Sequence, residues 1–254
     1  MREMVQGAHA LIKLRDMILT GSLRAGERVR ELALVEMLEL SRTPIRYALA
    51  KLVDEGLLEK AGGGLVVREF SREEIRDAIQ LRGALEGMAA RTAAENGAAA
   101  DLLPFAWQCV DELEEVLDAR RSSQAQIDRY VDINHRFHNL LAQISDSFVI
   151  QRTINHICSL PFASPNAFVM AHRGASEIRK MMIVSQHQHR TMLEAIERGD
   201  GARAEAIARE HAELSLGAMH KIFEEADNRD QATSLNLMAE TAKAAGIRSP
   251  KVDA

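Results

Sequence analysis

Cysteine is scarce in this sequence, and its scarcity excludes two classes of protein. Only Cys109 and Cys158 occur, far apart and each among apolar residues, with no C-x-x-C spacing. A small secreted domain held together by disulfides needs several cysteines at close spacing, and a cysteine metal site needs paired ones. We therefore expect two free, reduced thiols in the core of a cytoplasmic protein.

Long hydrophobic runs are also missing. The longest stretch without Asp, Glu, Lys, Arg or His covers residues 157–171, and Pro161 and Pro165 interrupt it, so it cannot span a membrane. A signal peptide is not expected either, because Arg15 and Asp16 break the first apolar run. The sequence predicts no membrane partner.

Aromatic residues make up only 4% of the chain, whereas hydrophobic residues make up 46% of its 254 residues. Ala, Leu, Glu and Arg are abundant, and these residues favour helices. This length suits two domains, each with its own core. The composition predicts a mainly α fold with little sheet.

Charge is unevenly distributed along the chain. Residues 1–70 hold eleven Lys and Arg against ten Asp and Glu, while the rest holds twenty-one against twenty-seven. A net charge of +1 in residues 1–70 is too small to form the basic surface that is typical of nucleic-acid-binding domains. If that part binds DNA, its affinity must come from locally placed arginines and from dimerisation that doubles the contacts.

The stretch LSRTPIR at residues 40–46 predicts the first turn of a helix that lies in the major groove of DNA. Ser41 is placed to cap that turn, and Pro44 is tolerated there because its missing amide has no intrahelical partner. Two faces follow from helical spacing: a buried one with Ile45, Leu49, Leu52 and Val53, and an exposed one with Arg42, Thr43, Arg46, Tyr47 and Ala50. Arginine and threonine on the exposed face can donate to guanine edges or phosphates. A solvated amphipathic helix with two surface arginines is the alternative.

The neighbouring residues complete a helix-turn-helix with a wing. A turn-rich connector at 21–27 precedes a short helix predicted over residues 31–39. After the recognition helix ends at a glycine, Gly62-Gly63-Gly64 joins two short apolar runs, 57–61 and 65–68, that indicate a β-hairpin. This hairpin is the predicted wing.

Residues 21–67 resemble the winged helix-turn-helix of the GntR family of bacterial transcription regulators. The pattern is a G-x-L-x-x-G turn, S-R-T-P-[IV]-R, an A-L-x-x-L-x-x-E-G-L run and a glycine wing, and the sequence contains all four. The resemblance implies that Arg42, Thr43 and Arg46 contact DNA. It also implies that Gly63 or Gly64 lets the wing backbone approach the minor groove or a phosphate.

One position departs from the family pattern. Fatty-acid-responsive members carry an arginine ten residues before the first recognition arginine, where this chain has Leu32. Arg28 or Arg30 could substitute as phosphate contacts.

The remaining chain is predicted as a second, all-helical domain over residues 71–227, after a winged domain over residues 1–70. Ser71 opens it with the S-x-x-E form of a capping box, and a long helix follows to residue 97. Other helices are expected over 8–20, 99–119, 127–144, 148–159, 176–198 and 201–225, with a polar connector at 120–126. The polar tail at 228–254 is expected to be flexible.

Three histidines lie on apolar faces of different predicted helices. His138 follows Asn134 by one turn, and His189 and His211 lie on two later helices. A single histidine on such a face is usually a core residue with a satisfied hydrogen bond. Three imidazoles with one oxygen donor can instead converge on one ion and leave a position open for water or a ligand.

Residues 71–226 are similar to the all-helical ligand-binding domain called FCD, which follows many GntR-type winged domains. The motifs that carry this similarity are L-R at 81–82, L-E at 85–86 and F-H at 137–138, together with His211 twenty-two residues after His189. The resemblance implies a divalent metal, often zinc, held by the histidines and the residue four before the first, and helping to bind a small carboxylate effector. That fourth residue is Asn134 rather than the commoner Asp. An amide oxygen is a weaker donor than a carboxylate, which leaves open a lower metal affinity or a site that works without metal.

Arg82 is a candidate for a second effector contact, because an inward arginine can clamp a carboxylate with two hydrogen bonds. An ion pair with Glu86 or Asp77 inside the bundle is the alternative. Residues 75–79 and 161–163 resemble vanillate-responsive regulators, which implies an aromatic carboxylic acid such as vanillate as effector.

Together these patterns predict a homodimeric repressor of a catabolic operon. Two-fold symmetry in the protein would be matched by a palindromic operator, and effector binding among Arg82, Asn134, His138, His189 and His211 would release it. We expect the helix that follows Ser71 to shift and change the spacing of the two recognition helices.

Two other function classes use part of the same pattern. A metal-dependent hydrolase could use three histidines and a bound water, but no inward carboxylate is predicted near them as a general base, and it has no need of the helix at 41–46. A structural DNA-binding protein would use the winged domain alone, so replacing His138 and His211 would leave regulation unchanged. The sequence predicts a regulator and not an enzyme.

Overall fold

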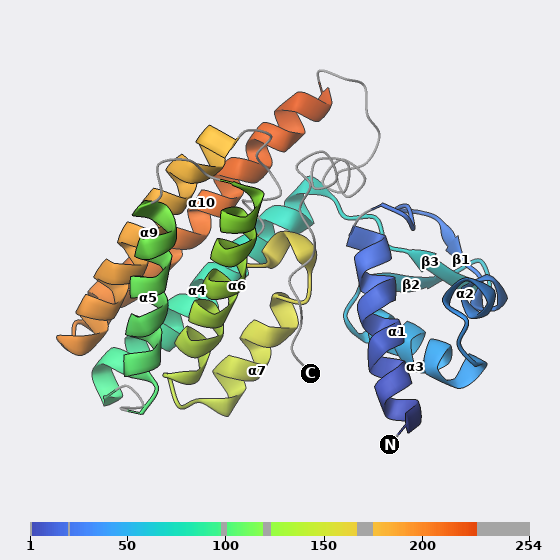
Figure 1. Ribbon diagram of the computed structural model, residues 1–254, viewed down its shortest axis with the longest axis horizontal. Coiled ribbons are helices and arrows are strands. Elements are labelled where there is room, and N and C mark those ends of the chain that lie inside the picture. Colours follow the sequence, from blue (N-terminus) through green and yellow to red (C-terminus); the bar gives the residue numbers. More distant parts are fainter. Residues whose placement is uncertain (1, 20, 98–100, 119–122, 167–174, 228–254) are drawn as a thin grey trace.

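The computed structural model describes residues 2–19, 21–97, 101–118, 123–166 and 175–227, and the predicted flexible tail at 228–254 lies outside them. Figure 1 shows a small N-terminal unit of helices and a sheet beside a larger bundle of helices. The fold is mainly α, as predicted, with an N-terminal winged helix-turn-helix followed by a helical bundle.

The N-terminal unit contains α1 (Arg2–Leu19), α2 (Glu31–Leu38) and α3 (Arg42–Asp54). Its sheet has the antiparallel order β1-β3-β2, with β1 (Arg28–Val29), β2 (Leu58–Ala61) and β3 (Gly64–Val67). The predicted buried face of α3 supplies Ile45, Leu49 and Leu52 to a core shared with Leu14 and Ile18 of α1, while Val53 is half-buried. Packing against α1 therefore fixes which side of α3 is exposed.

Three details of this unit differ from the sequence-based expectation, and the first is that α1 begins at Arg2 rather than at residue 8. Ser41 is the N-cap residue of α3, but its side chain makes no capping hydrogen bond, so the start of α3 depends on the extended backbone there and on Pro44. The sheet also has a third strand, β1, which the sequence did not predict because two residues are too few to show alternation.

The bundle contains six α-helices and a 3-10 turn among the described residues. They are α4 (Arg72–Asn96), α5 (Leu103–Asp118), α6 (Gln124–Gln143), α7 (Phe148–Ile157), η1 (Pro161–Ala163), α9 (Ala175–Glu197) and α10 (Gly201–Asp227). Ser71 and Glu74 form the predicted capping box at the start of α4. A second capping box, between Ser123 and Gln126, starts α6 three residues before the predicted start at 127.

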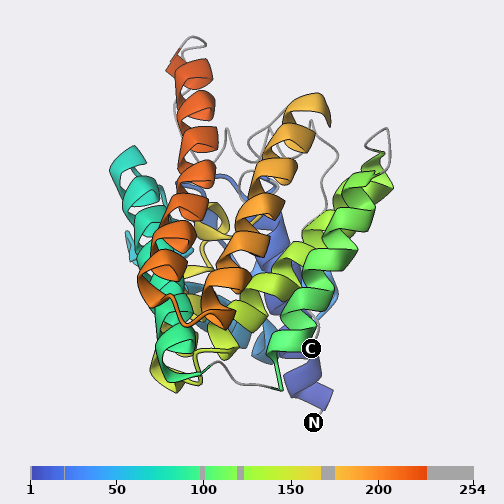
Figure 2. The same cartoon turned by 90° about the vertical axis from the view of Figure 1, so that its left-hand side faces the viewer.

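Helices α4 and α10 lie against each other along much of their length (Figure 2). Small residues permit this close approach: a Cβ atom on Gly83 would lie 2.7 Å from the Cβ of Ala212, and one on Gly87 would lie 3.0 Å from the side chain of Glu205. The larger side chains Leu81 and Met88 of α4 are exposed instead. Arg82 and Glu86 consequently face the inside of the bundle.

The two units share part of their core. Phe70, in the segment between β3 and α4, packs edge-to-face against Phe162 of η1, with ring centroids 4.8 Å apart. Both rings are buried. Over the residues that the structure describes, every helix is too short or too polar to cross a membrane.

Candidate functional site

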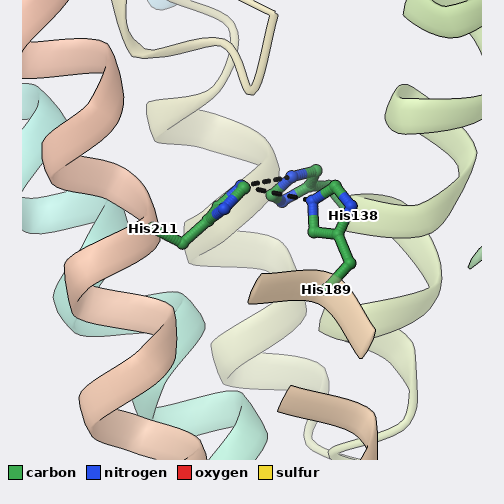
Figure 3. A group of neighbouring side chains, drawn as sticks. All are labelled: His138, His189 and His211. Carbon is green, nitrogen blue, oxygen red and sulfur yellow. Dashed lines mark hydrogen bonds between the residues drawn. The ribbon is translucent and has the colours of Figure 1, made fainter. Parts of the chain in front are cut away.

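Three helices bring their histidines to one point inside the bundle. His138 of α6, His189 of α9 and His211 of α10 are buried, and Figure 3 shows their imidazoles pointing toward one another. The Nε2 atom of His211 lies 3.2 Å from that of His138 and 3.3 Å from that of His189. Residues far apart in the sequence thus form the cluster that their inward positions predicted.

The opposite ring nitrogens have partners that fix the protonation of each imidazole. His138 Nδ1 lies 2.8 Å from Glu86 Oε1, His211 Nδ1 lies 3.1 Å from Gln188 Oε1, and His189 Nδ1 lies 3.4 Å from Gln186 Oε1. Because all three partners are oxygen acceptors, each Nδ1 carries a hydrogen and donates it. In a neutral imidazole the Nε2 atom then has a free lone pair that can bind a metal ion.

Burial favours the neutral form of two of the imidazoles, those of His189 and His211. It lowers the pKa of His189 well below 6.5, and the neighbouring His211 and His138 lower it further. Burial also lowers the pKa of His211 well below 6.5, with His138 adding to the effect. Two Nε2 lone pairs at this distance repel each other unless a proton or a metal ion lies between them.

The spacing of the nitrogens fits a bound metal ion. A tetrahedral ion with metal–nitrogen bonds of about 2.0–2.1 Å separates its ligand nitrogens by about 3.3–3.4 Å. The two measured Nε2 separations are 3.2 and 3.3 Å, and the ligand atoms of all three histidines lie within 4.8 Å of one another. These three residues can hold a divalent metal.

Asn134 lies one turn before His138 on α6 and is completely buried. Its Nδ2 donates to Asn166 Oδ1 at 2.8 Å, and Asn166 Nδ2 donates to the backbone oxygen of Val131 at 3.1 Å. These two bonds fix the orientation of the Asn134 amide and leave its Oδ1 buried without a hydrogen-bond partner among the described residues. A buried oxygen without a donor is available to a metal ion or to a ligand.

Arg82 is completely buried and holds three elements together. Its Nη1 donates to the backbone oxygen of Ala163 in η1 at 3.2 Å, and its Nη2 donates to Ser215 Oγ of α10 at 3.1 Å. Its Nε lies 3.6 Å from Glu86 Oε2. Of the two ion-pair partners considered from the sequence, Glu86 is therefore the one that faces Arg82, while Asp77 pairs with Arg76.

The sequence-based expectation that no inward carboxylate lies near the histidines is wrong, because Glu86 lies beside His138. The sequence placed Glu86 only as a partner of Arg82, but its Oε1 contacts His138 Nδ1. Burial raises the pKa of Glu86, yet His138 and Arg82 outweigh this effect and lower it to about 2. The carboxylate lies on the Nδ1 side of His138, away from the converging Nε2 atoms, so it orients the imidazole and is not placed as a base at an ion.

The predicted DNA-contacting side chains lie on the exposed face of α3. Arg42, Thr43 and Arg46 are exposed, and Arg46 Nε lies 2.9 and 3.0 Å from the two carboxylate oxygens of Glu31 in α2. This ion pair is open to solvent, so it adds little stability but directs the guanidinium group. Two adjacent helices therefore set the direction of Arg46.

The wing residues have different roles in the structure. Arg28 Nη2 donates to the backbone oxygen of Gly62 at 2.8 Å, so this guanidinium group braces the turn of the hairpin. Gly64 makes room for it, since a Cβ atom there would lie 2.8 Å from Arg28 Nη2. Gly63 has φ of +75° with open space around it, and Arg30 is exposed at the N-cap of α2.

Family comparison agrees with both units. Residues 77–214 match the model of the FCD domain, and residues 8–67 match that of the bacterial regulatory proteins of the gntR family. The chain belongs to the GntR family and carries an FCD domain. Its members and relatives are DNA-binding transcription regulators and not enzymes, so this GntR-family chain is a regulator as well.

Several regulators are similar over most of this GntR-family chain. The transcriptional regulator LutR of Bacillus subtilis is 26% identical over 82% of this chain and 99% of its own length. The transcriptional repressor RspR of Escherichia coli is 26% identical over 73% and 76%, and the Glc operon transcriptional activator of the same organism is 24% identical over 82% and 87%. Among solved structures, E. coli McbR/YncC superimposes with a TM-score of 0.65 at 18% identity, covering 86% of this chain and 98% of that one, which shows a common fold.

The side chains that support the site were not predicted from the sequence to do so. The side chains concerned are Glu86, Asn166, Gln186, Gln188 and Ser215. The spacing of Arg82 and Glu86, and the two glutamines just before His189, were signals that could have been used. Asn166 lies in a loop, where no periodicity shows which way a side chain points.

Proposed function

We propose that this GntR-family regulator is a homodimeric repressor of a catabolic operon that a small carboxylic acid releases from a palindromic operator. The acid binds in the cytoplasm beside a zinc ion held by His138, His189 and His211, with Asn134 as a further oxygen donor. The observation that carries the proposal is the convergence of three buried imidazoles, with two Nε2 separations close to those between ligands of a tetrahedral ion. When bound, the ion supplies a positive charge that attracts a carboxylate.

Arg82 supplies the second half of the acid site. Its Nε is buried without a hydrogen-bond partner in the described part of the chain, and its Nη atoms hold Ala163 and Ser215 with single bonds. A carboxylate that enters here gains two parallel hydrogen bonds from this guanidinium group. The resemblance of residues 75–79 and 161–163 to vanillate-responsive regulators supports an aromatic acid such as vanillate.

A short chain of contacts links this site to the DNA-binding unit. Arg82 holds the carbonyl of Ala163, the adjacent Phe162 packs on Phe70, and Phe70 immediately precedes the N-cap residue of α4. An acid that draws Arg82 away from Ala163 frees η1 and moves the segment between the units. Together with a shift of α4, this movement changes the spacing of the two recognition helices and lowers the affinity for DNA.

DNA binding depends on a few well-placed side chains rather than on net charge. Arg42, Thr43 and Arg46 enter the major groove, and the wing glycines Gly63 and Gly64 approach the backbone of the DNA. Arg28 and Arg30 act from the edge of the sheet and the start of α2, Arg28 mainly by holding the wing. Two such units related by two-fold symmetry recognise a palindrome.

The decisive experiment measures metal content, acid binding and DNA release on the same purified protein. Elemental analysis is expected to find about one zinc per chain. Vanillate and benzoate are then screened for a rise in melting temperature, with and without chelator, and for release of DNA from the upstream region of its own gene in gel shifts. Equal operator affinity with and without a bound acid would reject the proposal, and stabilisation by an acid in metal-free protein would assign the histidines as direct hydrogen-bond partners of the acid.

The contact between Phe70 and Phe162 is tested with Phe162→Leu, which keeps an apolar side chain of similar size but loses the edge-to-face ring contact. This variant is expected to bind DNA and acid nearly as the wild type does, while the acid releases much less DNA. Phe148→Leu is the matched control, because Phe148 is 72% exposed. Full acid-induced release in Phe162→Leu would show that η1 does not carry the signal.

A further inference from the structure

Buried polar side chains extend beyond the histidines along two helices of the bundle. On α6, Tyr130 and Asn134 precede His138 by two turns and one turn. On α9, Ser185 precedes His189 by one turn. All five side chains are buried. Because residues four apart share a helix face, each helix carries a line of polar groups that starts at its histidine and faces the same interior.

The two lines lie on the same side of the histidine cluster. Helices α6 and α9 begin at the same end of the bundle and run in the same direction (Figure 2). One turn of four residues rises by about 6 Å, so Ser185 lies roughly that far along α9 from His189. Tyr130 lies near Ser185: burial raises the pKa of its phenol, and the Ser185 hydroxyl lowers it. These two hydroxyl groups form a second polar place, set apart from the histidines.

The hydroxyl of Ser185 is not used by the fold. Although the phenol of Tyr130 is near, Ser185 Oγ is buried without a hydrogen-bond partner in the described part of the chain. An unpaired hydroxyl inside a protein costs free energy that alanine would avoid, and native structures rarely keep one unless a bound molecule pairs with it. The proposed ion accounts for the unpaired Oδ1 of Asn134, but it does not account for Ser185 one turn away.

We infer that Ser185, with Tyr130 beside it, binds a hydroxyl group at the far end of the acid, so that this chain selects hydroxy-substituted acids over unsubstituted ones. The inference rests on the proposed function and deepens it. A hydroxyl group donates and accepts, so it pairs with Ser185 Oγ in either sense. Since the carboxylate lies at the histidines and Arg82, a ring with its hydroxyl opposite the carboxylate fits, whereas a ring with the two groups adjacent does not.

The test is a calorimetric titration of the full chain with benzoate, 4-hydroxybenzoate and 2-hydroxybenzoate. We expect 4-hydroxybenzoate to bind roughly 3- to 10-fold more tightly than benzoate, the range of one hydrogen bond, and 2-hydroxybenzoate to bind as benzoate does. Equal affinity for benzoate and 4-hydroxybenzoate, or an equal gain from the adjacent hydroxyl, would overturn the inference and leave the acid site in place. Absence of binding by all three acids would overturn the proposed aromatic-acid sensing as well.

Three variants locate the preference at the hydroxyl pair. Ser185→Ala should lower the affinity for 4-hydroxybenzoate to that for benzoate and leave benzoate binding unchanged, and Tyr130→Phe should reduce the preference less. Thr153→Ala is the matched control, because it removes an exposed hydroxyl on α7 that bonds only to the carbonyl of Val149. A full preference in Ser185→Ala would overturn the inference. Thermal unfolding checks each variant, and the wild-type comparison of the three acids stands even if one of them unfolds.

Discussion

At the scale of single residues, the direction of each imidazole follows from what its Nδ1 atom contacts. Glu86 accepts the Nδ1 hydrogen of His138, and this makes the Nε2 atom of His138 a stronger electron-pair donor to a metal ion. The oxygens of Gln186 and Gln188 have the same effect, more weakly, on His189 and His211. Gln186 cannot turn its amide around, because its Nε2 donates to the backbone oxygen of Val110 at 2.6 Å. The inward lone pairs are therefore imposed by the surrounding bonds.

Replacing Glu86 tests this control of the imidazole. Glu86→Gln keeps the shape but removes the charge that orients His138, so zinc affinity should fall roughly 10- to 100-fold. Chelator competition in the presence of acetate measures it. Glu73→Gln, on the exposed side of α4, is the control and should show no change. Unchanged affinity in Glu86→Gln would show that Asn134 and the three imidazoles suffice without the carboxylate.

The buried histidines also predict how the metal-free protein responds to acid. The pKa values of His189 and His211 are lowered in the folded state, whereas the unfolded chain takes up these protons near pH 6.5. The unfolded state thus binds more protons below that pH, and stability should fall by up to about 1.4 kcal/mol per pH unit for each histidine. Urea unfolding between pH 7.5 and 5 measures the loss. His211→Asn should reduce the slope, and a flat wild-type profile would contradict the prediction.

At the scale of elements, α3 combines a rigid position with freely accessible arginines. Its inner face packs on α1, where Arg15 also pairs with Glu55 at the end of α3, and its outer face presents Arg42 and Arg46. Glu31 of α2 orients the guanidinium group of Arg46 by forming an ion pair with it. Since the N-terminal part has a net charge of only +1, each of these arginines should carry a large share of DNA affinity.

Arg42→Ala tests that share. Loss of a base contact should weaken operator binding by about 1–3 kcal/mol and relax specificity at one base pair. Loss of a phosphate contact should instead lower the salt slope, which is the slope of the logarithm of the binding constant against the logarithm of the salt concentration, by about 1. Fluorescence anisotropy at several salt concentrations distinguishes these two results. Arg198→Ala, at the end of α9, is the charge-matched control. Wild-type affinity and slope in Arg42→Ala would mean that this face of α3 does not meet DNA.

Much of the element pattern was predictable from local signals. Ser71 with Glu74 marked the start of α4, Pro104 lies in the first turn of α5 as expected, and Gly199-Asp200 separates the last two helices. These signals depend on residues within one turn of each other. The early start of α6 was missed because Ser123 and Gln126 were assigned to a polar connector.

At the scale of the whole molecule, the proposed acid site and the proposed DNA-binding face belong to separate units that meet at Phe70 and Phe162. Regulation therefore requires a movement between units, and two-fold pairing of chains would convert that movement into a changed spacing of two recognition helices. LutR, RspR and the Glc activator show that similar chains include both repressors and activators.

Dimeric recognition makes a prediction about the operator. Analytical ultracentrifugation of the free protein should show a dimer, and a DNA fragment with one half-site destroyed should lose most of its affinity, with the salt slope falling by about half. Scrambling the bases between the half-sites is the control, because it leaves both contact surfaces in place. A monomer that binds single half-sites as tightly as the whole operator would contradict the prediction.

The sequence by itself determined the family of folds, the recognition helix and the three inward histidines, because helical period, turn residues and short motifs are local properties. Tertiary structure alone decided that His138, His189 and His211 meet, that Glu86 supports His138, and that Asn166 fixes the amide of Asn134. It also decided that Arg28 braces the wing and that Phe162 rests on Phe70. These contacts join residues distant in the chain, and their geometry follows from how the helices pack, which no local pattern contains.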